Sequence, residues 1–179
     1  TKMTGEWLAW CNACPVPEIA NVFNRCNIPF YQVTGTLDDD SDCWQQVDDW
    51  MEAARVAYAM EHNRLGVMGH YYCGMLDIYS DLTQQCAYFG GHIELLEVDE
   101  LASLRKKVSA DALPQRVALF HDAFDVQPDC PQEELERAAR TSLALDALVE
   151  EKCLGSMAYY YMGTGSPENE DAISSIILG

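Results

Sequence analysis

Basic residues are scarce in this sequence. Eleven Lys and Arg stand against 29 Asp and Glu among 179 residues, which gives a formal charge of −18. Nucleic acid is therefore disfavoured as a partner, because phosphate binding needs clustered Lys and Arg. An anionic membrane surface is disfavoured for the same reason, and no apolar run approaches the roughly 20 residues that cross a bilayer.

The sequence also lacks several motifs that would point to other functions. It contains neither a phosphate-cradling glycine motif nor a nucleophile elbow. No secretory signal precedes the eight cysteines, which are spread along a well-patterned chain, so we expect reduced thiols in the cytoplasm. The chain opens on Thr1 without an initiator Met and closes on an apolar run before Gly179, so we expect a fragment of a longer protein.

What the sequence does contain is an alternation of short apolar runs and helical periodicity. The patterns predict strands at 6–10, 28–33, 65–68, 93–98 and 153–161, and helices at 15–26, 44–61, 78–89, 99–108, 114–124, 132–151 and 168–178. This alternation predicts an α/β fold with a parallel sheet covered on both faces, a Rossmann-like three-layer arrangement. A boundary near Asn63 would separate the end of a first α/β domain (1–63) from a second one (64–179) that is cut short at its C-terminus.

Two of the predicted helices carry apolar stripes. The first has apolar residues at the i, i+3, i+4, i+7 spacing of a buried face, with Asn27 as its C-cap: Ile19, Val22, Phe23 and Cys26. The second has a longer stripe: Trp44, Val47, Trp50, Met51, Ala54 and Ala57. The acidic turn between them, residues 35–42, could hold a divalent cation, but helix capping is the better interpretation.

The stretch Arg64–Thr83 has the pattern of a strand, a ligand-facing loop and a helix. In open α/β sheets, loops at the carboxyl ends of strands are where ligands bind, which makes His70 and Tyr72 candidate site residues. A second aromatic run, Tyr159–Tyr161, ends the last strand; Tyr159 and Tyr161 share one face and Tyr160 opposes them. Tyrosine rings suit the C–H surface and hydroxyls of a sugar, although these residues also have high β propensity.

Cysteine and histidine chemistry is a weaker alternative. Cys11 and Cys14 form a Cys-x-x-Cys before a helix, as in thiol oxidoreductases, but the larger alternating sheet that follows does not fit that class. The other six cysteines mostly fall in apolar patterns, which predicts that they lie in the core. The four histidines stand singly, so they supply no zinc site with the cysteines.

The chain resembles the L-arabinose isomerase family in several ordered segments. The matching pieces are PVPEIANVFNRC, FYQVTG, RLGVMGHYYCGMLDIYSDLTQQCAYFG, HIELLEVDEL and LGSMAYYYMGTGSPENEDAISSIILG. The resemblance implies an aldose–ketose isomerase that binds a divalent metal, usually Mn²⁺, through two Glu and two His. The metal polarises two sugar oxygens while carboxylates move protons between C1 and C2. It also implies that those four residues lie beyond Gly179, so this segment alone should be inactive.

The same resemblance assigns substrate contacts. Tyr161 falls where the family has an aromatic contact, and Tyr72 where it has an apolar one. Cys11 and Cys14 stand where typical members carry Gln and His, which in the family serve a neighbouring subunit's site within a trimer or hexamer. We therefore expect a segment of a cytoplasmic, oligomeric sugar isomerase with candidate contacts at Tyr161, Tyr72, His70 and Cys14. The alternatives are a non-catalytic sugar-binding module and a thiol oxidoreductase that uses Cys11 and Cys14.

Overall fold

The computed structural model describes residues 14–36, 38–72, 74–75, 78–163 and 165–176. The chain divides into two compact units, with the division between Ala54 and Arg55, inside a long helix. The assignment of residues 1–63 and 64–179 to two domains of a larger enzyme stays a prediction, and the predicted strand at 6–10 lies outside the described residues.

The first unit contains helix α2 (Pro15–Arg25) and the first two thirds of helix α3 (Ser41–Glu61). Prolines in the first turn of α2 lack an N–H group that the helix could not use there, which explains why the helix begins at this point. The C-cap is Cys26, one residue before the predicted one, and Asn27 follows in a left-handed conformation with φ 54°. Asp40 accepts hydrogen bonds from the Thr36 and Cys43 amides, both at 3.0 Å, which confirms the capping interpretation of this turn.

Two predictions for this unit are wrong. Residues 28–33 form no strand, because a strand needs a hydrogen-bonded neighbour and none of the described residues supplies one. The apolar stripe of α2 is not buried as predicted, since Val22 is 55 % exposed; Met51 in the stripe of α3 is 59 % exposed as well. None of the described residues from 14 to 54 is buried. The periodicity therefore predicts the helices correctly, but it does not predict whether their apolar residues are buried.

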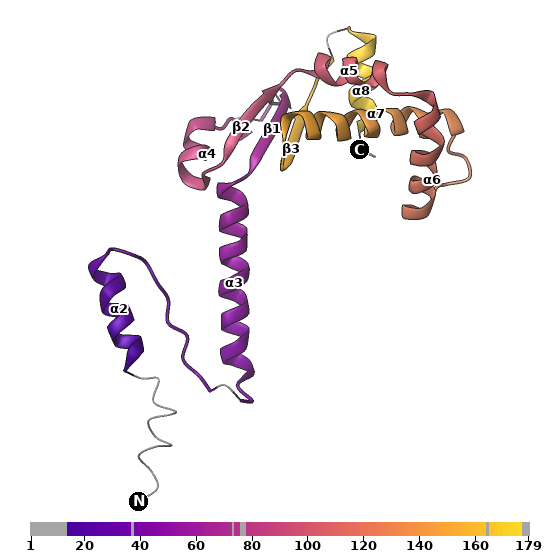
Figure 1. Ribbon diagram of the computed structural model, residues 1–179. Coiled ribbons are helices and arrows are strands. Elements are labelled where there is room, and N and C mark those ends of the chain that lie inside the picture. Colours follow the sequence, from indigo (N-terminus) through magenta and orange to yellow (C-terminus); the bar gives the residue numbers. More distant parts are fainter. Residues whose placement is uncertain (1–13, 37, 73, 76–77, 164, 177–179) are drawn as a thin grey trace, which may run out of the picture. The chain divides into compact units, whose positions relative to one another are not determined.

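The second unit is built on a parallel sheet of β1 (Arg64–Gly69), β2 (His92–Leu96) and β3 (Ser156–Tyr160), shown in Figure 1. The strand order is β2-β1-β3, with Met68 opposite Leu96 on one side and Tyr159 on the other. This confirms the predicted parallel sheet. The order also means that the chain crosses from one edge of the sheet to the other between β2 and β3.

The connections between the strands are helical. They comprise α4 (Leu82–Phe89), α5 (Val98–Lys107), the 3₁₀ turn η2 (Ala110–Ala112), α6 (Leu113–Ala123), α7 (Gln132–Lys152) and, after β3, α8 (Pro167–Ser174). Helix α4 begins four residues later than predicted, because the Asp81 side chain caps the amides of Thr83 and Gln84. Helix α5 begins at Val98, one residue before the predicted range, and its N-cap is Glu97.

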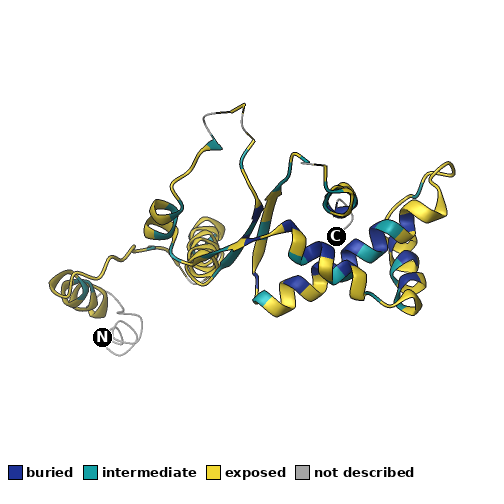
Figure 2. Ribbon diagram, turned by 90° about the horizontal axis from the view of Figure 1, so that it is seen from above, coloured by how far each residue is buried: buried dark blue, intermediate teal, exposed yellow. Residues whose placement is uncertain are grey.

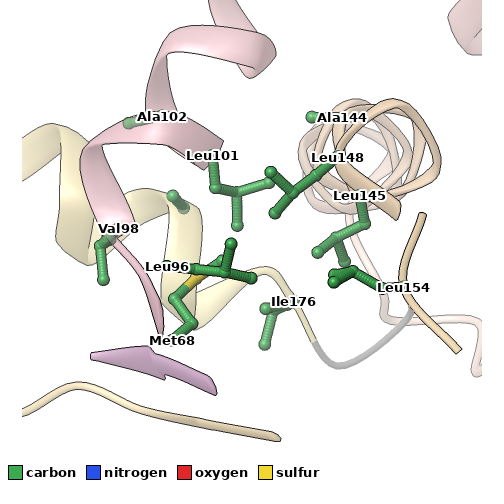
Figure 3. Packing of buried hydrophobic residues seen from close by; sticks show 11 residues of the cluster. Met68, Leu96, Val98, Leu101, Ala102, Ala144, Leu145, Leu148, Leu154 and Ile176 are labelled. Atoms are coloured by element: carbon green, nitrogen blue, oxygen red, sulfur yellow. The ribbon is translucent and has the colours of Figure 1, made fainter. Parts of the chain in front are cut away.

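The main core lies between the sheet and helices α5, α7 and α8. Figure 3 shows Leu96, Leu101, Leu145, Leu148 and Leu154 pointing toward one another, and Leu101 and Leu148 are fully buried. Burying one such leucine stabilises the fold by roughly 1.5–3 kcal/mol. The helix predicted at 132–151 is confirmed as α7, which buries most of its apolar residues, and in Figure 2 the dark blue residues gather on the helices of this unit. A second cluster joins α6 to the first half of α7.

Helix α4 lies on the other face of the sheet, where Cys86 and Phe89 share a small cavity with Leu65 and Ile93. Leu95 on the same face is 69 % exposed, so α4 covers only part of that face. The α/β character of the chain is therefore clear, but three strands are too few to establish a Rossmann-like three-layer domain.

Candidate functional site

The loops after β1 and β3 meet at the carboxyl edge of the sheet. Gly69 ends β1 with φ 82°, opposite Tyr160 of β3. A Cβ atom on Gly69 would lie 1.9 Å from the Tyr160 carbonyl oxygen, so only glycine allows the two backbones to approach this closely. The next amide, that of His70, donates to the same oxygen at 3.0 Å. This glycine and this hydrogen bond bring the two loops together.

Three side chains form an aromatic cluster at this edge, consisting of His70, Tyr72 and Tyr160. The Tyr160 ring lies 5.4 Å from the His70 ring and 5.5 Å from the Tyr72 ring, both edge to face. Each such pair stabilises the arrangement of its two rings by about 0.5–1.5 kcal/mol. Tyr72 remains 45 % exposed, so its ring surface is available to a ligand.

The loop that carries Tyr72 is also held at its base. The Tyr71 ring contacts Tyr79 edge to face at 5.8 Å, and His70 Nδ1 lies 2.9 Å from the Tyr71 carbonyl oxygen. A carbonyl oxygen accepts only, so Nδ1 carries the proton and the Nε2 of a neutral His70 is left as an acceptor. An acceptor of this kind can bind a sugar hydroxyl.

The structure therefore brings two of the four predicted contacts together, His70 and Tyr72. Tyr161 follows Tyr160, and its ring packs against the main core, so it is half-buried. Tyr160, which meets the other two rings, was not selected from the sequence. Tyr160 meets these rings because β1 and β3 pair with Gly69 opposite Tyr160. Pairing between residues 91 positions apart cannot be predicted from local patterns.

The cysteine predictions have a different outcome. Cys14 belongs to the first unit, where it is the exposed N-cap residue of α2, and Cys11 lies outside the described residues. The prediction that the other cysteines are core residues is wrong for those that are described, since Cys26, Cys130 and Cys153 are exposed and Cys43 and Cys86 are half-buried. Cysteine fits both buried and surface positions, so an apolar pattern around it does not decide its burial.

The carboxyl edge carries no positive charge from the chain segments that build it. Residues 65–104 and 153–179 contain no Lys or Arg; they include β2, β3, the loops after the strands and all of β1 except Arg64, which begins that strand at its amino end. Acidic residues also occupy the first turns of the two helices that follow β2 and β3, α5 with Asp99 and Glu100 and α8 with Glu168 and Glu170. These segments therefore supply no Lys or Arg to a phosphate group, and Lys106 and Lys152, which lie outside them, pair with Glu168 and Glu100.

A cavity of about 440 Å³ lies elsewhere in the second unit, between α5, α6, α7 and α8. Three of its four basic groups pair with acids across helices: Arg105 and Arg137 both pair with Asp171, at 2.6 Å and 3.0 Å, and Lys106 pairs with Glu168 at 2.5 Å. These pairs tie helices together, and for this reason we place the candidate site at the aromatic cluster and not in this larger space.

In the part of the chain that the structure describes, no group of three or more His, Cys, Asp or Glu could hold a metal ion. Among the same residues, none of the helices has both the length and the apolar character that crossing a bilayer requires. The comparisons of this chain with models of protein families and with curated proteins gave no match.

Proposed function

We propose that this chain is part of a metal-dependent aldose–ketose isomerase similar to the L-arabinose isomerases, and that it supplies sugar contacts. The observation that carries the proposal is the aromatic cluster of His70, Tyr72 and Tyr160 at the meeting point of two parallel strands. Strand β1 is the central strand of the sheet. The next strand in the chain, β2, lies on one side of it, and β3 lies on the other. Crevices at such switches of direction are where open α/β sheets bind ligands.

The chemistry of the cluster favours an uncharged sugar. Tyrosine rings offer flat surfaces for sugar C–H groups, while the phenol groups and His70 Nε2 can bond to hydroxyls. Because the edge segments contain no Lys or Arg, a phosphorylated sugar is disfavoured. Pentoses and hexoses in their neutral forms are therefore the substrate class that we propose.

The proposal extends beyond the described residues in four respects: the metal, the location, the oligomer and the complete domain. Mn²⁺ would be held by residues outside this chain and would polarise the sugar oxygens when bound. The residues of this chain would bind and orient the sugar. The cytoplasmic location, the trimer or hexamer and the Rossmann-like three-layer domain belong to the same proposal.

A non-catalytic sugar-binding module is the second candidate function. The aromatic cluster can contact a sugar without a carboxylate, and none of its three members is an acid. The two candidates differ in their dependence on metal, because a binding module needs no Mn²⁺ and converts nothing.

The test is an isomerase assay on the full-length protein with Mn²⁺ and a panel of neutral aldoses and their phosphates. We expect conversion of one or more neutral aldoses to the ketose. Tyr160→Ala should raise KM about fivefold to thirtyfold, on the order of 1–2 kcal/mol, because it removes the ring that holds His70 and Tyr72.

The matched control is Tyr88→Ala, which removes an exposed tyrosine from α4, near its end that leads into β2. Its KM should not change. Binding of a sugar without conversion would favour the second candidate, and no interaction with any sugar would rule out both. A loss in Tyr161→Ala with none in Tyr160→Ala would return the contact to the residue chosen from the sequence.

A further inference from the structure

Glu170 in α8 reaches back to the loop that follows β3. Its Oε1 accepts a hydrogen bond from the Gly165 amide at 3.1 Å. The same oxygen lies beside Gly163, where a Cβ atom would be 3.0 Å from it, and Gly163 has φ 68°. A single carboxylate therefore contacts both glycines that come after Tyr161 and Met162.

The helix that carries Glu170 is itself held firmly at this end. The next residue, Asp171, binds Arg105 of α5 at 2.6 Å and Arg137 of α7 at 3.0 Å. The preceding residue, Asn169, donates to Asp99 in the first turn of α5 at 2.5 Å. Three consecutive residues of α8 thus bond to three different parts of the second unit, and Glu170 is the one that bonds to the loop.

We propose that Glu170 is a positioning residue for the candidate sugar site. It holds the start of α8 against the loop after β3, and this fixes where the chain turns away from Tyr160 and the aromatic cluster. The inference rests on the proposed function for its consequence, the binding of sugar, but the positioning itself can be observed without a ligand.

The experiment compares Glu170→Ala, Glu170→Gln and the control Glu168→Ala in the full chain. Glutamine keeps an oxygen that can accept the Gly165 amide, whereas alanine does not. Glu168 is in the same helical turn but pairs with Lys106 at the surface, so its removal should change little. Two readouts are needed: hydrogen exchange and NMR shifts of the Gly165 amide and of the His70, Tyr72 and Tyr160 rings, and the Kd for the neutral aldose that wild type binds best.

We expect Glu170→Ala to speed exchange of the Gly165 amide, to shift the three ring signals and to raise Kd about threefold to tenfold. Glu170→Gln should restore all three, and Glu168→Ala should behave as wild type. Unchanged ring signals in Glu170→Ala, or a glutamine variant as impaired as the alanine one, would overturn the positioning role. If wild type binds no sugar, the proposed function fails, and the NMR readout still decides the role of Glu170.

Discussion

Glycine 69 is the residue on which the geometry of the carboxyl edge depends. Two separate properties disfavour a side chain at this position: the left-handed φ of 82°, and the short distance to the Tyr160 carbonyl oxygen. Gly165 has a similar φ of 85°, but among the described residues, its chain neighbours apart, no atom lies within 4 Å of the position that its Cβ would take. The two glycines therefore differ in steric contact and not in backbone conformation.

This difference gives a residue-scale prediction. Gly165→Ala should destabilise the chain by about 1–2 kcal/mol, the cost of the left-handed conformation. Gly69→Ala should cost more, because its Cβ also collides with the Tyr160 carbonyl oxygen. Urea unfolding of both variants measures the two costs, and equal losses would show that the close approach of β1 and β3 is not maintained in solution.

Helix α8 shows how an element of eight residues is held in place. Burial alone would raise the pKa of Asp171, but hydrogen bonds from Arg105 and Arg137, together with their positive charges, hold that pKa below its ordinary value. Of the two arginines, Arg105 depends more on the pair with Asp171, because its side chain is only 8 % exposed. Its guanidinium charge needs the carboxylate of Asp171 nearby.

The prediction at the scale of elements concerns pH. Since the pKa of Asp171 is lower in the folded state than in the unfolded state, the ionised carboxylate stabilises the fold at neutral pH. That stabilisation should decline once the pH falls below about 4, where the unfolded state begins to bind the proton first.

Asp171→Asn should therefore lower the free energy of unfolding by about 1–2 kcal/mol at pH 7, a modest value because the carboxylate is 43 % exposed. The difference from wild type should shrink as the pH approaches 3. Asp146→Asn is the control, because it breaks an exposed pair with Arg116 and should cost less than about 1 kcal/mol. An Asp171→Asn defect of the same size at pH 3 and pH 7 would contradict the assigned cause.

The second unit has a core, whereas none of the described residues of the first unit is buried. Every buried residue that the structure describes lies between residues 66 and 176. Residues 14–54 expose Ile19, Val22, Trp44, Trp50 and Met51. Short helices without such burial are marginal in water.

This imbalance predicts how the chain behaves when it is divided. A piece from Arg55 to Gly179 should keep cooperative urea unfolding, and its free energy of unfolding should differ from that of the whole chain by less than about 1 kcal/mol, a typical single-substitution effect. A piece from Thr1 to Ala54 should show little helix by circular dichroism. Loss of cooperativity in the longer piece would show that the first unit contributes to its core.

Local patterns in the sequence were sufficient to predict most elements of this protein. Helical periodicity predicted α7 at 132–151, and short apolar runs predicted β1, β2 and β3. These elements depend on residues that are close together in the sequence, so the sequence by itself determines them.

Only the tertiary structure decided which apolar residues are buried and which aromatic residues meet. The stripes of α2 and α3 have the pattern of a buried face, yet burial requires a second surface, and no described residue of that unit is buried. At the carboxyl edge, Tyr160 and not Tyr161 joins His70 and Tyr72, because the pairing of β1 with β3 places Gly69 opposite Tyr160. Such pairing depends on contacts between distant parts of the chain, which local periodicity does not encode.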